Sequence, residues 1–305
     1  MLEKEIFNLG FRGNISSNIN IGEKTAFKTK SLANFFIEPA DEKSLSIILK
    51  HLKTKKENFF VLGGGNNTLI NENGIKIVVC LKKFFNNFKI LQQNNEEIYL
   101  TIESGAMLPK ICWHCAIKGY SGLNALIGIP GTIGGAVFMN AGTTKGTIFS
   151  LIEKINIMDF NGDKYFLNKK EINPSYRKIQ LNNIKDFIIL DCTLKLKKNN
   201  DGKTIKEAKE FMKARKNSQP IKEKSCGCFF KNPENNLPAG MLIEKAGLKG
   251  KRIGGAKISE IHANFIINEK DCSASDILKL KNFVQEEVNK KFKVTLEPEV
   301  KIVGR

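Results

Sequence analysis

The apolar positions before residue 198 follow helical spacing in some stretches and strand-like runs in others. Over 44–52 the apolar residues Leu45, Ile48 and Leu52 recur at helical spacing, which predicts a helix. A strand is predicted directly after it at 58–62, with further strands at 75–81, 98–103, 151–159, 164–167 and 187–197. Another helix is predicted at 109–118, ending at Gly119. Because α/β proteins build ligand sites where a glycine loop follows a strand, we expect such a site just after 58–62.

A polar, turn-prone run at 197–202 is the best candidate for a domain boundary. Beyond it the pattern predicts helices at 204–216, 237–246 and 273–292, and a strand at 263–268. This second part forms an α+β unit of about a hundred residues, which is a common domain size. The sequence therefore predicts two domains.

Composition narrows the classes of protein to consider. The 305 residues are 41% hydrophobic and 26% charged, as in ordinary globular proteins, and no run reaches the roughly 18 apolar residues of a membrane span. The chain starts with acidic residues, Glu3 and Glu5, where a signal peptide would be basic, so we expect a cytoplasmic protein without membrane contact. The net charge of +18 raises the question of nucleic acid. Only five basic residues are arginine and the lysines are spread along the whole chain, so we expect no nucleic-acid partner.

The seven cysteines show no zinc-ribbon spacing, which fits reduced thiols. Cys112 and Cys115 fall in the predicted helix 109–118, where we interpret them as a packed helix face rather than a redox motif. The three histidines are scattered, so no metal site is expected.

The first motif with chemical content is a glycine loop between two apolar runs. It reads Gly63, Gly64, Gly65, Asn66 and Asn67. Glycines let successive backbone N–H groups surround an anion such as a pyrophosphate. The loop is neither a P-loop nor the dinucleotide fingerprint. Taken alone, it fits a tight turn between strands equally well.

A second glycine-rich segment is longer and carries no charge. It runs Gly128-Ile129-Pro130-Gly131-Thr132-Ile133-Gly134-Gly135-Ala136 and ends at Met139-Asn140-Ala141-Gly142. Small residues allow close approach to a flat ligand, and the peptide dipoles can meet its ring nitrogens and carbonyls. We interpret this segment as part of a cofactor site.

These two motifs, in this order, closely resemble those of the UDP-N-acetylenolpyruvoylglucosamine reductase family. The resemblance continues through further stretches along the chain: Pro174-Ser175-Tyr176-Arg177, Gly227-Cys228-Phe229-Phe230-Lys231-Asn232-Pro233, Ala239 to Glu244, His262-Ala263-Asn264-Phe265 and Leu296 to Lys301. It implies an α+β protein with an FAD-binding domain of the PCMH type, built from two α/β subdomains, over 1–198. A smaller α+β substrate-binding domain would follow over 199–293, and a C-terminal strand over 294–305 would carry a catalytic glutamate.

The resemblance also implies the reaction. NADPH would reduce a non-covalently bound FAD, and the flavin would reduce the enolpyruvyl ether of UDP-N-acetylglucosamine enolpyruvate to UDP-N-acetylmuramate, a peptidoglycan precursor. Arg177 would hold the substrate carboxylate and the growing enolate charge. Cys228 stands where the family usually has a serine that donates a proton to the enolate carbon. Glu299 falls on the family's glutamate in the closing strand, and the choice between it and Glu297 rests on the resemblance alone.

The binding residues are assigned in the same way. Those implied for the cofactor are Gly63, Gly64, Gly65, Asn66, Asn67, Gly128, Ile129, Pro130, Gly131, Thr132, Gly134, Gly135, Ala136, Asn140 and Ala141. Those implied for the substrate are Tyr176, Lys216, Lys231 and Asn232. The helix that opens near Ala239 could also present its N-terminus to a phosphate.

Two other interpretations stay open. A flavin oxidase of alcohols or hydroxy acids could share the FAD domain, but it should lack the Cys228 and Glu299 stretches in this order. A basic nucleic-acid-binding protein would be colourless and would show salt-dependent DNA binding. We expect a monomer, since no apolar surface stripe is evident, and the shorter family form that lacks a tyrosine-bearing loop.

Overall fold

The chain forms two compact units that are not contiguous in sequence. The computed structural model describes residues 2–199, 202–234 and 237–304. Unit 1 comprises Met1–Ser16, Phe35–Gly64 and Ile77–Ala214, and unit 2 comprises Ser17–Asn34, Gly65–Lys76 and Arg215–Arg305. The first glycine motif is therefore divided between the units after Gly64. Of the predicted boundary run, Asn200 and Asp201 lie outside the described residues.

A four-stranded sheet lies near the N-terminus. Its strand order is β1 (Gly13–Asn20), β2 (Leu32–Pro39), β5 (Ile75–Val79) and β3 (Phe60–Val61). Helix α2 (Glu42–Thr54) begins after Asp41, whose side chain accepts a hydrogen bond from the Ser44 N–H at 2.7 Å, as an N-cap should. Leu45, Ile48 and Leu52 are all fully buried in one core, to which α1 (Leu2–Asn8) also contributes. The predicted helix at 44–52 is confirmed.

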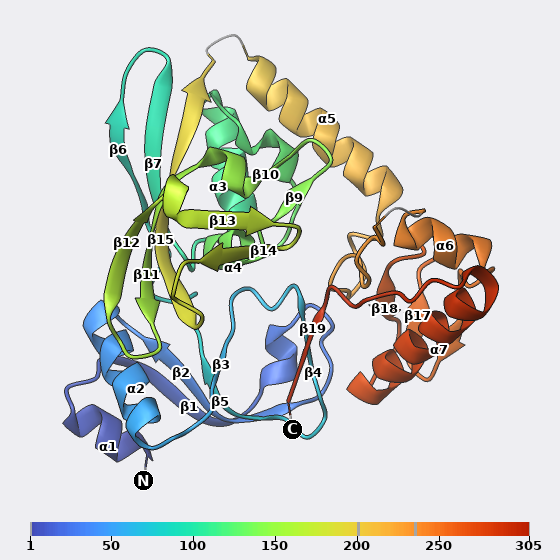
Figure 1. The fold of residues 1–305 in the computed structure, drawn as a ribbon, viewed down its shortest axis with the longest axis horizontal. Coiled ribbons are helices and arrows are strands. Elements are labelled where there is room, and N and C mark those ends of the chain that lie inside the picture. The colour runs from blue at the N-terminus through green and yellow to red at the C-terminus, as the bar shows by residue number, and fades with distance from the viewer. Residues whose placement is uncertain (1, 200–201, 235–236, 305) are drawn as a thin grey trace. The chain divides into compact units, whose positions relative to one another are not determined.

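The largest sheet of unit 1 has six antiparallel strands. Figure 1 shows five of them side by side. They are β12 (Lys164–Asn168), β11 (Ile152–Asp159), β15 (Phe187–Lys198), β7 (Glu97–Glu103) and β6 (Phe88–Gln93), and β8 (Tyr120–Ser121) also pairs with β15. Every second residue of β7 is buried, in a core shared with α3 (Leu108–Ile117) and α4 (Ile133–Phe138). Cys112 and Cys115 lie in this core, and the interpretation as a packed helix face is confirmed.

Short elements complete unit 1. They are η2 (Leu123–Leu126), β9 (Gly142–Thr143), β10 (Gly146–Thr147), η3 (Ile148–Leu151), η4 (Lys169–Glu171) and the hairpin of β13 (Ile172–Ser175) and β14 (Lys178–Leu181). Helix α5 (Lys203–Ser218) begins in unit 1 and ends in unit 2. The polar run at 197–202 thus precedes a helix that itself crosses the division.

Unit 2 is built from segments at both ends of the chain. Its elements are η1 (Ile21–Lys24), β4 (Thr68–Ile70), α6 (Ala239–Lys245), β16 (Arg252–Ile253), β17 (Ala256–Ile258), β18 (Ile266–Asn268), α7 (Ala274–Phe292) and β19 (Lys301–Val303). Strands β4 and β19 pair in parallel, so β19 is hydrogen-bonded to the strand that directly follows the first glycine motif. Phe229 packs between Phe27 and Phe230, with ring centroids 6.2 and 5.2 Å away. These three rings are fully buried and belong to the hydrophobic core of the unit.

Some predicted elements differ in extent from the observed ones. The strand predicted at 58–62 has only two residues, and the one predicted at 263–268 begins at Ile266. Helix α6 begins at Ala239 because Pro238 occupies its N-cap position. Helix α4 was not expected, since its glycines have low helix propensity. Its local cause is Thr132, whose hydroxyl accepts a hydrogen bond from the Gly135 N–H at 3.3 Å.

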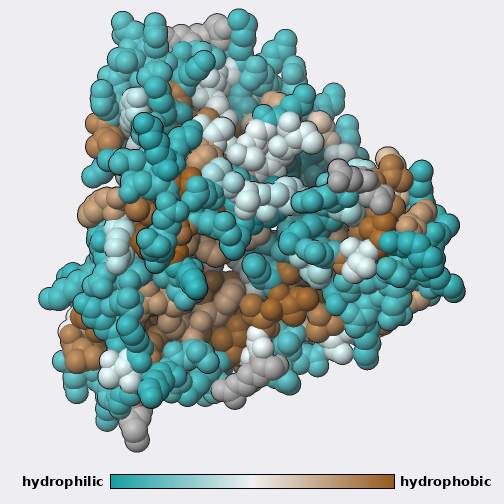
Figure 2. Space-filling model, viewed as in Figure 1, coloured by the Kyte–Doolittle hydropathy of each residue, from teal (hydrophilic) through white to brown (hydrophobic). Residues whose placement is uncertain are grey.

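The surface carries mostly hydrophilic side chains. Figure 2 shows hydrophilic side chains over most of the visible face, with smaller hydrophobic areas between them. Among the described helices, none is both long and apolar enough for a membrane crossing.

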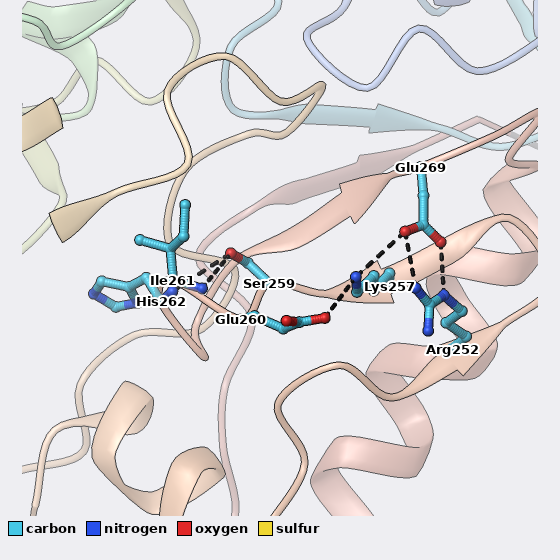
Figure 3. A network of polar contacts seen from close by, with 7 residues as sticks. All are labelled: Arg252, Lys257, Ser259, Glu260, Ile261, His262 and Glu269. Carbon is cyan, nitrogen blue, oxygen red and sulfur yellow. Dashed lines mark hydrogen bonds and ion pairs between the residues drawn. The ribbon is translucent and has the colours of Figure 1, made fainter. Parts of the chain in front are cut away.

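An ion-pair network joins the strands of the small sheet in unit 2 (Figure 3). The Arg252 guanidinium donates two hydrogen bonds to the Glu269 carboxylate, at 2.7 and 3.0 Å. Lys257 Nζ lies 3.3 Å from Glu269 and 2.8 Å from Glu260. The hydrogen bond from Arg252 lowers the pKa of Glu269 to about 2. The ionised form of Glu269 is therefore favoured in the folded protein.

This shift predicts an acid-dependent loss of stability. A carboxyl group whose pKa is lowered by folding stabilises the protein above its unfolded pKa, and the stabilisation disappears as the pH falls through its folded pKa. We expect Glu269→Gln to lower the free energy of unfolding at about pH 6, and the difference from wild type to shrink towards zero near pH 2. Urea unfolding over this pH range measures it, with Glu286→Gln on the exposed surface of α7 as the matched control. A difference that stays constant across the range would contradict the assignment.

Candidate active site

The two glycine segments meet in unit 1. A Cβ atom on Gly63 would lie 3.0 Å from Thr132 Oγ1 and 3.8 Å from the Cα of Gly135. A Cβ on Gly134 would lie 2.7 Å from the Cβ of Ser104, a distance that packed atoms do not tolerate. Gly134 can lie this close to Ser104 only because it has no side chain, and a Cβ on Gly63 would crowd the Thr132 hydroxyl. The residues implied for the cofactor come from both motifs, and Gly63 of the first motif lies beside Thr132 and Gly135 of the second.

Two buried polar side chains beside these segments have an atom without a hydrogen-bond partner in the described part of the chain. Ser104 and Asn140 are 5% and 7% exposed, and within the described part of the chain Ser104 Oγ and Asn140 Oδ1 have no hydrogen-bond partner. Buried polar atoms usually have one, supplied by protein, water or ligand. A ligand with its own donors and acceptors, such as the heteroatom-rich flavin, fits such a lining. The residues present are therefore compatible with the implied cofactor.

Arg177 lies at the tip of the β13–β14 hairpin. Ser175 pairs with Lys178, so Tyr176 and Arg177 form a two-residue loop, and Arg177 has a left-handed backbone with φ of 58°. A non-glycine residue in this region costs roughly 1 kcal/mol or more. Arg177 Nη1 donates a hydrogen bond to the Gly142 carbonyl at 3.1 Å, and its guanidinium lies 5.1 Å from the centroid of the Tyr176 ring.

The same hairpin is tied to the second glycine segment. Asn140 Nδ2 donates to the Ser175 carbonyl at 3.1 Å, next to the contact between Arg177 and Gly142. Asn140 itself has a left-handed backbone, with φ of 41°. The strained loop is thus fixed at two points to the end of the segment, which places the predicted catalytic arginine beside predicted cofactor residues in unit 1.

Cys228 and Glu299 come together in unit 2 through backbone pairing. The Glu299 N–H donates to the Phe229 carbonyl at 2.8 Å, and the Lys231 N–H donates to the Glu297 carbonyl at 2.8 Å. Glu299 was expected inside the closing strand, which is wrong in detail. It lies in the extended segment before β19, because Pro298 and Glu299 pair with the Phe229 region, and β19 starts only at Lys301.

Asn67 of the first glycine motif belongs to the same neighbourhood of unit 2. Its Nδ2 donates to the Glu299 carbonyl at 3.2 Å, and its own carbonyl accepts from the Lys301 N–H at 3.0 Å. Gly65 has φ of 69°, and a Cβ there would lie 2.2 Å from the Lys24 carbonyl oxygen. The motif therefore requires glycine at 65, and it brings a predicted cofactor residue next to Glu299.

Asn264 fixes the backbone that carries Cys228. Its carbonyl accepts from the Phe229 N–H at 2.7 Å, its Oδ1 accepts from the Phe230 N–H at 2.9 Å, and its Nδ2 donates to the Phe230 carbonyl at 2.8 Å. The Asn264 N–H in turn donates to Nδ1 of His262 at 3.2 Å. Burial lowers the pKa of His262, which favours the neutral ring that this acceptor role requires. Ser259 accepts the N–H of His262, continuing the network in Figure 3.

The structure distinguishes the two glutamates that the sequence left equivalent. Glu297 is 71% exposed at its side chain and forms an ion pair with Lys231 at 3.1 Å. Glu299 is half-buried, and its backbone is held by Phe229 and Asn67. Of the two, Glu299 has the more enclosed environment, which favours it as the functional carboxyl group. Lys231, the partner of Glu297 in this exposed ion pair, is also a residue predicted to bind substrate.

Arg215 is a candidate residue that the sequence reasoning missed. It is half-buried at the end of α5, and its Nη1 donates to Gln219 Oε1 at 3.3 Å. Burial lowers the pKa of Arg215, whereas a negative charge on Cys228 would raise it, so the two side chains are electrostatically coupled. The available signal was the rarity of arginine in this chain. Lys216, which the sequence favoured, is exposed beside it.

The remaining predicted substrate residues have structural partners. Asn232 Oδ1 accepts a hydrogen bond from the Ala239 N–H at 3.1 Å, so this first N–H of α6 already has a partner within the chain. Tyr176 is 56% exposed on its hairpin. Across the described ranges, no cluster of three or more metal-binding side chains occurs.

Comparison with known proteins gives a consistent result. A family model described as an FAD binding domain matches residues 33–165, and one described as the UDP-N-acetylenolpyruvoylglucosamine reductase C-terminal domain matches residues 219–303. The UDP-N-acetylenolpyruvoylglucosamine reductase of Desulfosudis oleivorans is 35% identical and covers 97% of this chain and 96% of its own. That of Caldicellulosiruptor bescii is 38% identical over 92% of this chain and 88% of its own.

A solved structure extends the likeness to three dimensions. The UDP-N-acetylenolpyruvylglucosamine reductase of Thermus caldophilus has a TM-score of 0.81 at 31% identity, and the match covers 96% of this chain and all of that one. The expected fold class, α+β with an FAD-binding domain followed by a smaller domain, is confirmed. With relatives of this identity matched over nearly its whole length, the chain belongs to the UDP-N-acetylenolpyruvoylglucosamine reductase family.

Proposed function

We propose that this chain is an FAD-dependent oxidoreductase that reduces the enolpyruvyl ether of UDP-N-acetylglucosamine enolpyruvate to UDP-N-acetylmuramate at the expense of NADPH. The observation that carries the proposal is the pairing of the backbone around Cys228 with that around Glu299, beside Asn67 of the first glycine motif. The paired backbone segments carry a thiol and a carboxyl group, two groups able to handle protons, and one of these segments is bonded to a predicted cofactor residue.

The chemistry divides between the cofactor and the chain. When bound, the flavin supplies the hydride that reduces the methylene carbon of the enolpyruvyl group. Arg177 balances the negative charge that develops on the neighbouring carbon and carboxylate, since a guanidinium binds such oxyanions through two parallel hydrogen bonds. Its fixed loop, held by Gly142, keeps the charge in place before reaction.

Cys228 then delivers a proton to the carbon next to the carboxylate. The S–H bond breaks, a C–H bond forms, and the thiolate that is left is stabilised by the Arg215 charge. A thiol has a reference pKa near 8.5, far below that of the serine hydroxyl usual in the family, so it is a competent donor while protonated. Glu299 assists by stabilising or protonating the intermediate from the adjacent segment.

The other assignments complete the proposal. We propose that 1–198 binds FAD without a covalent bond, that 199–293 binds the substrate, and that 294–305 returns to supply Glu299. Tyr176, Lys216, Lys231 and Asn232 are proposed to contact the substrate. We further propose a cytoplasmic monomer whose partners are small molecules, with neither nucleic acid nor membrane, since the lysines are spread along the whole chain.

The colour of the purified protein tests the proposed cofactor. Under anaerobic conditions we expect a yellow protein whose flavin absorbance is bleached by NADPH and restored by the enolpyruvyl sugar nucleotide, because the two half-reactions use the same cofactor. Stopped-flow absorbance measures both steps. Bleaching of the oxidised flavin by a simple alcohol or hydroxy acid, tested in parallel, or a colourless protein, would contradict the proposal.

Substitution of Cys228 should affect only one of the two half-reactions. We expect Cys228→Ala to bleach with NADPH at the wild-type rate but to slow the step with the enolpyruvyl substrate by about 100-fold or more, because general acid catalysis contributes that much. Cys228→Ser is the matched control, since it keeps a proton donor of similar shape and should retain more activity than the alanine variant. If Cys228→Ala reacts with the enolpyruvyl substrate as fast as wild type, Cys228 is not the acid.

A further inference from the structure

Cys228 has a second thiol close to it in sequence that the proposed reaction does not use. Cys226, Gly227 and Cys228 form a Cys-Gly-Cys run, the one place in the chain where two cysteines are separated by a single residue. Two such Cα atoms are at most about 7 Å apart in an extended chain and closer in a bent one. Disulfides span about 4.4–6.8 Å between Cα atoms. The spacing therefore lies within reach of a disulfide.

The residue between them allows the chain to bend. Gly227 has φ of 80°, a left-handed conformation, and no atom lies within 4 Å of the position that a Cβ would take. The backbone is thus already turned at this residue, and neighbouring atoms do not block a further change. A glycine here adjusts its dihedral angles with little steric cost.

The two thiols differ in access to solvent. Cys226 is 7% exposed, burial raises its pKa to about 12, and its Sγ lies 3.6 Å from the Thr68 carbonyl oxygen, to which it donates. Cys228 is half-buried, whereas the other six cysteines are all buried. A small oxidant in solution therefore meets Cys228 first, while Cys226 is a protonated, buried thiol.

The charge next to Cys228 favours its reactive form. Oxidants react with the thiolate rather than with the thiol. A negative charge on Cys228 would raise the pKa of Arg215, so a thiolate at Cys228 and the Arg215 guanidinium would stabilise each other. This charge acts in the same direction as the greater exposure of Cys228.

We propose that Cys226 and Cys228 are a redox pair that a hydroperoxide converts reversibly into a disulfide. The Cys228 thiolate attacks one peroxide oxygen, so that an S–O bond forms and the O–O bond breaks. The other peroxide oxygen takes up a proton and leaves as water or an alcohol. The sulfur of Cys226 then displaces the hydroxyl group of the resulting sulfenic acid, and the proton of Cys226 leaves with it as water. Two thiols have lost two electrons, the peroxide has gained them, and a dithiol reductant reverses the change.

The disulfide removes the proposed proton donor. It also takes away the hydrogen bond from Cys226 to Thr68, the first residue of β4, which follows Asn67 directly. Turnover should stop while the disulfide is present. This consequence rests on the proposed function, whereas the formation of the disulfide does not.

The test oxidises the holoenzyme with hydrogen peroxide and measures mass and activity separately. After remaining thiols are blocked with N-ethylmaleimide, digestion at Lys224 and Lys231 releases the peptide that contains both cysteines. We expect this peptide to carry no label and to be about 2 Da lighter than its reduced form. We also expect turnover to fall at least about ten-fold and to return with dithiothreitol, as it should for a reversible two-electron change.

Matched variants separate the alternatives. In Cys226→Ser, peroxide should oxidise the Cys228 sulfur to acids that dithiothreitol reduces poorly. If the serine variant loses its flavin, Cys226→Ala takes its place and should give the same result. Cys272→Ser, which removes another buried thiol, should behave as wild type. Wild type that yields the same acids as Cys226→Ser, and no disulfide, would overturn the proposal. A disulfide that leaves turnover intact would support the redox pair and contradict the role of Cys228 as the acid.

Discussion

The arrangement of unit 2 depends on one set of backbone hydrogen bonds, those between the segment around Phe229 and the segment around Glu299. These segments lie far apart in sequence, and they carry the proposed proton donor Cys228 and the carboxyl group of Glu299. Asn264 holds the first segment through its side-chain amide and its carbonyl, and Asn67 holds the second. Backbone pairing fixes positions more tightly than contacts between long side chains, because fewer rotatable bonds lie between the anchor and the reacting group.

Unit 1 uses a different device for the same purpose. Gly134 allows main chain to pack against Ser104 where a side chain would collide, and a Cβ on Gly63 would crowd the Thr132 hydroxyl. The strained backbone of Arg177 is held by its contact with Gly142. Strain of this kind persists only when the surroundings determine it, and it is common at functional sites. The second glycine segment thus takes part both in the close main-chain packing and in holding the guanidinium of Arg177.

Much of the architecture could be predicted because it depends on local signals. The apolar spacing of α2 and α7 and the glycines of the two motifs lie within short stretches, and the structure shows them where expected. The motifs, taken in order, were specific enough to indicate the family. Cys112 and Cys115 were interpreted correctly from the helical context alone.

The rest depends on contacts between distant residues. Nothing near Asn264 in the sequence signals that it clamps Phe230, and Arg215 was passed over for the neighbouring Lys216, since only the fold reveals which of them is half-buried. The division of the first glycine motif between two units also escapes a sequence pattern. Helix α4 was missed because its stability comes from the Thr132 cap and packing that offset poor propensity.

The most direct test of the central pairing is the Asn264→Ala variant, studied by stopped-flow absorbance in its two half-reactions. Loss of the clamp should leave flavin content and bleaching by NADPH close to wild type, while the step with the enolpyruvyl sugar nucleotide slows by about ten-fold or more, because misplacing a catalytic group by about 1 Å can cost as much as 100-fold. A variant with normal flavin content in which the second step keeps its wild-type rate, or in which both steps slow equally, would contradict the account.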